Sequence, residues 1–132
     1  MTDSVPLTDL QIELMRVLWL QGEATVIEVH QRISQQRGLA QGTVATLLTR
    51  LEKKGAITHR TEGRQFVYRA LVSETEVRRS MLAQVADRLF GGDVPLLIHQ
   101  LLAEREVSAG DLAEVKALIA ERESTDRKET GK

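Results

Sequence analysis

The chain has 132 residues, of which 42% are hydrophobic and 28% charged, and its formal net charge is −1. This composition fits a soluble globular protein of one domain with a smaller extension, rather than a disordered chain. It contains no cysteine, which excludes disulfides, thiolate metal sites and a cysteine nucleophile, and without a signal peptide or an apolar run of about 20 residues we expect a cytoplasmic protein.

The motif Thr-x-x-Gln/Glu occurs twice near the N-terminus, starting at Thr8 and at Thr25. A hydroxyl at the N-cap and an amide or carboxylate three residues later satisfy each other's backbone N–H groups at the start of a helix. The two motifs therefore predict helices over residues 9–20 and 26–36.

The segment 41–54 predicts a third helix with two contrasting faces. Its apolar face consists of residues at helical spacing, which are Val44, Leu47, Leu48 and Leu51. The opposite face carries hydroxyls and cations at the same spacing, which are Thr43, Thr46, Arg50 and Lys53. Gly55 ends the helix, because glycine readily takes the left-handed conformation that follows a C-cap. Together with the preceding helix, this segment predicts a helix-turn-helix.

Two short strand-like runs follow and predict a β-hairpin, in which Gly63 suits a turn position with positive φ. In the second strand Phe66, Tyr68 and Ala70 share one face. Three helices followed by a hairpin form a winged helix-turn-helix. We therefore expect a mainly α protein in which residues 1–72 are a DNA-binding domain.

Cations are concentrated in this predicted domain, although the whole chain is slightly acidic. Residues 1–72 carry a net charge of +2 and residues 73–132 a net charge of −3. Phosphate contact depends on such local patches rather than on the isoelectric point. The residues that we expect to contact DNA are Thr43, Thr46, Arg50, Lys53, Lys54, Arg60 and Arg64, with His59 and Gln65 as secondary candidates.

Each of these features also has a structural interpretation. Charge clusters often form solvated faces, threonines are common on exposed helices, and Lys53 and Lys54 suit the negative end of a helix dipole. The combination of helix and hairpin favours DNA contact, most clearly for Arg64 at the hairpin tip.

Three further amphipathic helices are predicted over residues 73–90, 95–105 and 108–121. So small a helical unit rarely buries enough apolar surface alone, and we expect residues 73–121 to form a homodimerisation domain. The expected contacts are Val77, Met81, Val85, Leu89, Leu97, Ile98, Leu101, Leu102, Leu112, Val115, Leu118 and Ile119. The alternative is that these helices fold back on the N-terminal domain as a monomeric core. Residues 122–132 are charged, lack an apolar face, and are predicted to be disordered.

Enzymatic and metal-binding functions find little support in the sequence. His30, His59 and His99 share no ligand spacing, and Trp19 lies on the apolar face of the first helix, where we expect it in the core. Nucleotide-binding loops, His-Glu-x-x-His motifs and nucleophile elbows are absent. We therefore expect no catalytic site, no metal and no cofactor.

The elements resemble, in their order, those of the BlaI/MecI/CopY family of penicillinase-repressor transcription regulators over residues 7–121. The residues that carry the resemblance are Leu7-Thr8-Asp9, Leu18-Trp19, Thr43, Thr46, Leu47, Leu48, Arg50, Leu51, Lys53-Lys54-Gly55-Ala56-Ile57 and Glu62-Gly63-Arg64-x-Phe66-x-Tyr68. The resemblance implies a dimeric winged-helix repressor that binds a palindromic operator in double-stranded DNA. It implies DNA contacts by Thr43, Thr46, Arg50 and Arg64.

The resemblance also implies a regulatory circuit linked to antibiotic resistance. Family members are paired with a membrane metallopeptidase sensor of β-lactam or cell-wall stress, and signalling ends with cleavage of the repressor by a protease in its dimerisation region. The corresponding segment here reads Ile98-His99-Gln100-Leu101-Leu102. Gly42 stands where some relatives have a lysine, and the lack of cysteine excludes the copper-sensing branch with its Cys-x-Cys motifs.

A second hypothesis is a winged-helix protein-interaction module that presents the same face to a protein partner. The two hypotheses differ in the salt dependence of duplex binding, because phosphate contacts release counterions.

Overall fold

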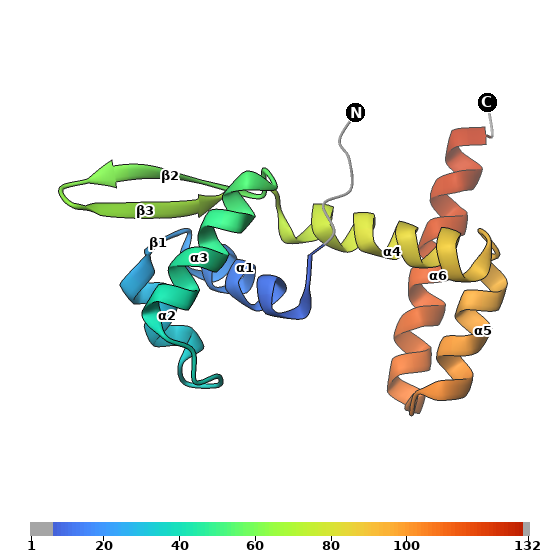
Figure 1. Cartoon of the computed structure of the whole chain (residues 1–132). Coiled ribbons are helices and arrows are strands. Elements are labelled where there is room, and N and C mark those ends of the chain that lie inside the picture. The colour runs from blue at the N-terminus through green and yellow to red at the C-terminus, as the bar shows by residue number, and fades with distance from the viewer. Residues whose placement is uncertain (1–6, 131–132) are drawn as a thin grey trace. The chain divides into compact units, whose positions relative to one another are not determined.

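Figure 1 shows the computed structural model of the chain, which describes residues 7–130 as six helices and three short strands. In chain order the elements are α1 (Asp9–Gln21), β1 (Glu23–Thr25), α2 (Val26–Ile33), α3 (Gln41–Lys53), β2 (Ile57–Glu62), β3 (Gln65–Ala70), α4 (Glu74–Phe90), α5 (Val94–Glu104) and α6 (Ala109–Thr130). The predicted class, a mainly α protein that begins with a winged helix-turn-helix, is confirmed. None of the helices in the described range is both long and apolar enough to cross a membrane.

Both predicted capping boxes are formed. At α1, Oγ1 of Thr8 accepts a hydrogen bond from the backbone N–H of Gln11 at 3.2 Å, and Oε1 of Gln11 accepts one from the N–H of Thr8 at 3.0 Å. At α2, Thr25 and Glu28 form the same two bonds at 3.2 and 2.8 Å. α2 is shorter than predicted, because the chain leaves the helix in a turn after Ile33.

The predicted hairpin, which we call the wing, consists of β2 and β3. The two strands pair antiparallel from Ile57 and Ala70 at the base to Glu62 and Gln65 at the tip. Gly63 in the turn has a φ of +65°, the positive value that the sequence predicts. β1 pairs with the other edge of β3 and completes a sheet of order β1-β3-β2. This strand is not among the predicted elements, since three residues that also cap a helix carry too little pattern.

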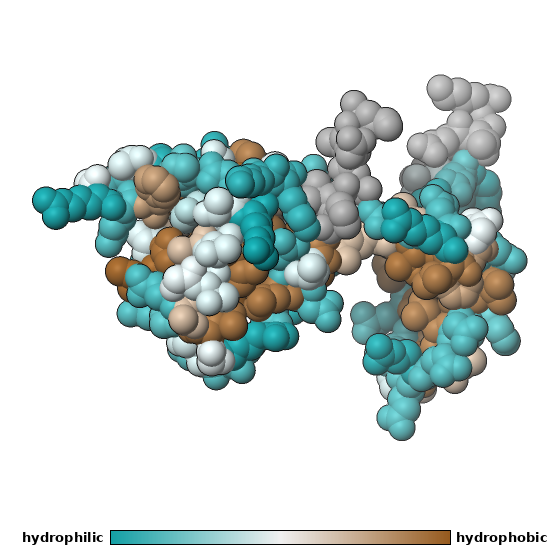
Figure 2. All heavy atoms as spheres, viewed as in Figure 1, coloured by the Kyte–Doolittle hydropathy of each residue, from teal (hydrophilic) through white to brown (hydrophobic). Residues whose placement is uncertain are grey.

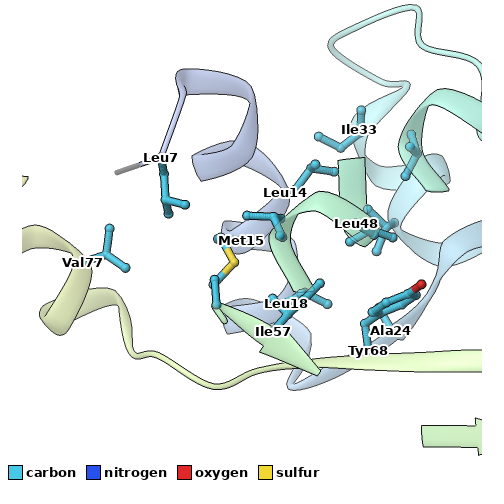
Figure 3. Packing of buried hydrophobic residues seen from close by; sticks show 14 residues of the cluster. Leu7, Leu14, Met15, Leu18, Ala24, Ile33, Leu48, Ile57, Tyr68 and Val77 are labelled. Atoms are coloured by element: carbon cyan, nitrogen blue, oxygen red, sulfur yellow. The ribbon is translucent and has the colours of Figure 1, made fainter. Parts of the chain in front are cut away.

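The core of the N-terminal part lies between α1, α2, α3 and the sheet, and Figure 3 shows many of its side chains. α1 and α3 contribute side chains that are at most 1% exposed, which are Leu14, Met15, Leu18, Val44, Leu48 and Leu51. Trp19 packs at the edge of this core, where its Nε1 donates a hydrogen bond to the backbone oxygen of Val72 at 2.8 Å. On the apolar face of α3, Val44, Leu48 and Leu51 are therefore buried as predicted and Leu47 is half-buried, while the polar face is left for solvent.

α4 begins within the N-terminal unit. Val77 is only 7% exposed and belongs to the same core cluster as Leu7, and Met81 packs against that cluster. The compact N-terminal unit accordingly runs to Leu89 and a second unit begins at Phe90, whereas the predicted boundary follows residue 72. We withdraw Val77 from the expected dimer contacts, because its side chain is buried within one chain and offers almost no surface to a partner.

The remaining expected dimer contacts keep apolar surface. Within α5 no residue is buried, and Figure 2 shows apolar side chains gathered on the surface of the C-terminal unit. Leu97 is half-buried. Exposed fractions of 39–75% are found for Val85, Leu89, Ile98, Leu101, Leu102, Leu112, Val115, Leu118 and Ile119.

α6 continues as a helix to Thr130, although the sequence predicts disorder over residues 122–132. Arg122 and Asp126 form an ion pair one turn apart at 3.3 Å, and such pairs support a helix that lacks an apolar face. Residues 131–132, for which disorder is also predicted, lie outside the described residues.

Candidate nucleic-acid interface

α3 presents a polar face on the side opposite its buried face. Thr43, Thr46, Arg50 and Lys53 are all exposed, and in Figure 2 side chains of near-neutral hydropathy run along this helix. Oγ1 of Thr46 donates a hydrogen bond to the backbone oxygen of Gly42 at 3.1 Å. The methyl group and the oxygen lone pairs of Thr46 thus remain available to a base edge.

Two features that sequence reasoning missed extend this face. Thr49 is exposed one turn further along, and its Oγ1 donates to the backbone oxygen of Ala45 at 3.0 Å. The N-cap of α3 is Ala40, which supplies no capping side chain. Backbone N–H groups in the first turn of a helix bind phosphate when no cap occupies them. The uncapped start of α3 could have been recognised in the sequence, because α3 lacks the capping-box motif that begins the two preceding helices.

The wing tip and the start of α3 border one cleft of about 280 Å³. The cleft is lined by Thr25, Val26, Ile27, Gln41, Arg64, Gln65 and Phe66. Arg64 directly follows the Gly63 turn and is exposed. A guanidinium at this position can reach a phosphate or the minor groove beside bases that face α3.

Arg60, in contrast, is held by carboxylates of the sheet. Its Nη2 lies 2.9 Å from Oε1 of Glu23, and its Nη1 contacts the carboxylate of Glu62. The hydrogen bonds that Arg60 donates to Glu23 and Glu62 raise the pKa of Arg60, and the bond to Glu23 lowers the pKa of that carboxyl group. In the free protein Arg60 therefore links β2 to β1 across β3, and two carboxylates compensate its charge. Its side chain is exposed, so Arg60 remains an expected DNA contact that has to exchange these partners for phosphate.

The two lysines at the end of α3 differ in their surroundings. Nζ of Lys54 donates a hydrogen bond to Oε1 of Gln11 at 2.8 Å, so it ties the end of α3 to the capping box of α1. Lys53 is the last residue of α3 and is exposed on the same face as Arg50. Lys53 therefore stays among the candidates for phosphate contact, whereas the ammonium group of Lys54 is engaged by Gln11 in the free protein.

His59 lies in an aromatic cluster on the wing face that meets α3. Its ring stacks on Phe66 with centroids 4.0 Å apart, and the Tyr68 ring centroid lies 5.5 Å away. Nδ1 of His59 is 2.8 Å from Oε1 of Glu52 on α3. Burial raises the pKa of the Tyr68 phenol, and the charge of Glu52 raises it further. Strand alternation places Phe66 and Tyr68 together, but no local pattern points to Glu52.

Residues 7–121 match the family model described as penicillinase repressor. The chain belongs to the penicillinase repressor family. This family member is 27% identical to the penicillinase repressor of Bacillus licheniformis over 115 residues, which cover 87% of the chain and 90% of the relative.

Two further relatives agree with this assignment. The repressor is 24% identical to the methicillin resistance regulatory protein MecI of Mammaliicoccus sciuri over 107 residues, which cover 81% of the chain and 87% of MecI. The solution structure of the DNA-binding domain of the repressor BlaI is 34% identical, with a TM-score of 0.51, and the match covers 58% of this chain and 93% of that domain. As a member of this family the chain is a DNA-binding transcriptional repressor and not an enzyme. The hypothesis of a protein-interaction module that does not read DNA is thereby set aside.

Proposed function

We propose that this chain is a homodimeric repressor that binds a palindromic operator, with α3 and the wing of each copy at one half-site. The observation that carries this proposal is the exposed polar face of α3 in a chain of the penicillinase repressor family. Arg64 of the wing lines a cleft together with Gln41, the first residue of the same helix. Relatives named penicillinase repressor and MecI suggest resistance genes as the regulated class.

Within this proposal the contacts divide by chemistry. Thr43 and Thr46 lie in the N-terminal half of α3, the part that approaches bases when a helix-turn-helix docks in the major groove. Arg50, Lys53 and Arg64 carry charges that meet phosphate oxygens, which fix the position of the protein on the duplex.

The C-terminal unit supports the dimeric part of the proposal. α5 has no buried residue, and apolar side chains of α5 and α6 are half exposed in a single chain. Contiguous apolar surface of this kind marks an interface. A two-fold dimer is the commonest solution, and it presents two recognition helices to the two halves of a palindrome.

The operator can be found by selecting duplexes from a random-sequence library with the full chain, and we call the tightest binder the selected duplex. The proposal expects this duplex to contain two inverted half-sites whose centres are about one helical turn apart, or a multiple of it. Enrichment of a sequence without two-fold symmetry would contradict the dimeric arrangement.

Arg64→Ala is expected to weaken binding to the selected duplex and to random duplexes by a similar factor. A wing-tip guanidinium that contacts the DNA backbone does not distinguish between sequences. Without it, binding releases one fewer counterion for each copy of the chain. The slope of log affinity against log salt concentration should therefore fall by about one unit for each copy of the chain. Titrations at several salt concentrations measure this slope.

Arg122→Ala, which removes the same charge from α6, is the control and should leave the slope unchanged. A loss confined to the selected duplex would show that Arg64 reads bases, and the assignment to backbone would then be wrong.

The proposal extends to derepression by proteolysis, signalled by β-lactam or cell-wall stress through a membrane sensor. Gln100 and Leu101, in the segment that corresponds to the cleavage region, lie within α5. Both are exposed in a single chain, and Leu101 is also one of the expected dimer contacts. Cleavage there would separate α6 from the rest of the chain. Since α5 and α6 carry most of the expected dimer contacts, the cut chain would lose its second half-site.

A further inference from the structure

Side-chain contacts connect the last turn of α3 to the tip of the wing through His59. Nδ1 of His59 lies 2.8 and 2.9 Å from the two carboxylate oxygens of Glu52. On its other side the imidazole ring stacks on Phe66, with an interplanar angle of 20°. Phe66 stands two residues from Arg64, and both line the cleft at the start of α3.

The hydrogen bond between His59 and Glu52 has a defined donor and a defined acceptor. A carboxylate only accepts hydrogen bonds, so Nδ1 of His59 carries the hydrogen, either in the neutral Nδ1–H tautomer or in the imidazolium. Phe66 is 47% exposed, so the core does not hold its ring, and the flat contact with His59 restricts its motion. The chain of contacts Glu52–His59–Phe66 thus runs from α3 to the outer part of the wing, where Phe66 is exposed.

These contacts contribute little to folding stability. The side chains of His59 and Glu52 are 27% and 32% exposed, and partly exposed ion pairs add little to the free energy of unfolding. Their main physical effect is to restrict the angle between the wing and α3. Such restriction matters when one rigid ligand has to meet both elements at once, because disorder that persists in the free protein must be lost on binding.

We propose that His59 is a positioning residue for DNA binding, which with Glu52 and Phe66 holds the wing at a fixed angle to α3. Arg64 then reaches the duplex when the exposed face of α3 enters the groove. This inference rests on the proposed DNA contacts of α3 and the wing. We call the three side chains Glu52, His59 and Phe66 the clamp. One experiment below measures how narrowly the clamp fixes the wing, and a second measures its effect on DNA binding.

The first experiment measures the geometry without DNA. Because the chain has no cysteine, Arg64→Cys and Thr46→Cys place two spin labels in the full chain, which is then diluted with unlabelled chain. We expect a narrow distribution of label-to-label distances, which Glu52→Ala and His59→Ala both broaden. Glu52→Gln keeps an acceptor oxygen for Nδ1–H and should restore the narrow distribution.

Thr58→Ala, one residue away on the opposite face of β2, is the matched control and should leave the distribution narrow. Equal widths in all these proteins would overturn the clamp. Circular dichroism melting is recorded for each, and we expect the Glu52 variants to unfold at the wild-type temperature within a few degrees. If His59→Ala unfolds, the Glu52 variants alone decide the outcome.

The second experiment measures the effect on DNA. Arg64→Ala is expected to lower the affinity for the selected duplex about tenfold in the wild-type background, but about threefold or less in the Glu52→Ala background. We expect the smaller factor in the Glu52→Ala background because a wing that is not held in place already contacts the duplex poorly, so that removing Arg64 costs less. An equal factor in both backgrounds would overturn the positioning role.

A lack of any effect of Arg64→Ala in the wild-type background would instead refute the proposed DNA contact, and the positioning role in DNA binding with it. The spin-label distances still report on the clamp itself in that case.

Discussion

A fragment that ends at Leu89 is expected to bind the selected duplex about 10²–10³-fold more weakly than the full chain. It keeps Val77 and Met81, so the core of the N-terminal unit stays complete. It loses α5 and α6, and with them most of the expected dimer contacts. Each half-site must then be bound in a separate event rather than through one tethered dimer. Competition titration measures the affinity, and sedimentation velocity at micromolar concentration should show a dimer for the full chain and a monomer for the fragment.

A pair of substitutions on α5 tests the same point without truncation. Leu101→Lys places a charge on the expected interface and should give a folded monomer, whereas Gln100→Lys, at the neighbouring position, should remain dimeric. A full chain that sediments as a monomer and unfolds cooperatively would contradict the dimer. A fragment that binds as tightly as the full chain would contradict the role of the second half-site.

Thr46→Ala is expected to lower the affinity for the selected duplex by about 1–3 kcal/mol, the usual scale of one base contact. The change removes a methyl group and a hydroxyl from the exposed face of α3 and leaves Val44, Leu48 and Leu51 in the core. Affinity for random duplexes should hardly change, so the ratio of specific to non-specific binding falls. Competition between the selected duplex and random DNA measures this ratio.

The control for Thr46→Ala is Thr125→Ala on α6. Oγ1 of Thr125 donates a hydrogen bond to the backbone oxygen of Glu121 at 3.0 Å, the same kind of bond that Thr46 makes. This variant should leave both affinities unchanged. An unchanged ratio in Thr46→Ala and also in Thr43→Ala would mean that another surface reads the sequence.

The elements that local chemistry specifies could be predicted from the sequence. The capping boxes at Thr8 and Thr25 fix the starts of two helices through bonds between near neighbours. The spacing of apolar residues identifies the buried face of α3, and hence the exposed face, because a helix repeats its sides every few residues. Gly63 marks the tip of the wing by its conformational freedom.

Contacts between distant residues could not be predicted in this way. In the sequence Arg60 is indistinguishable from the other cations of its segment, because its partner Glu23 is brought beside it only by the pairing of β1 in the folded sheet. Lys54 likewise reads as a basic residue at a helix end, yet its ammonium bonds Gln11 of α1. Val77 fits the apolar stripe of α4, but periodicity does not say whether that stripe meets the same chain or a second copy.

The most direct test of the account is to map the amide chemical-shift changes of the full chain when it binds the selected duplex. We predict the largest changes in residues 41–53, on α3, and in residues 62–66, at the tip of the wing. Changes confined to α1 or to the C-terminal unit, with α3 and the wing unaffected, would show that the DNA is bound by a different surface.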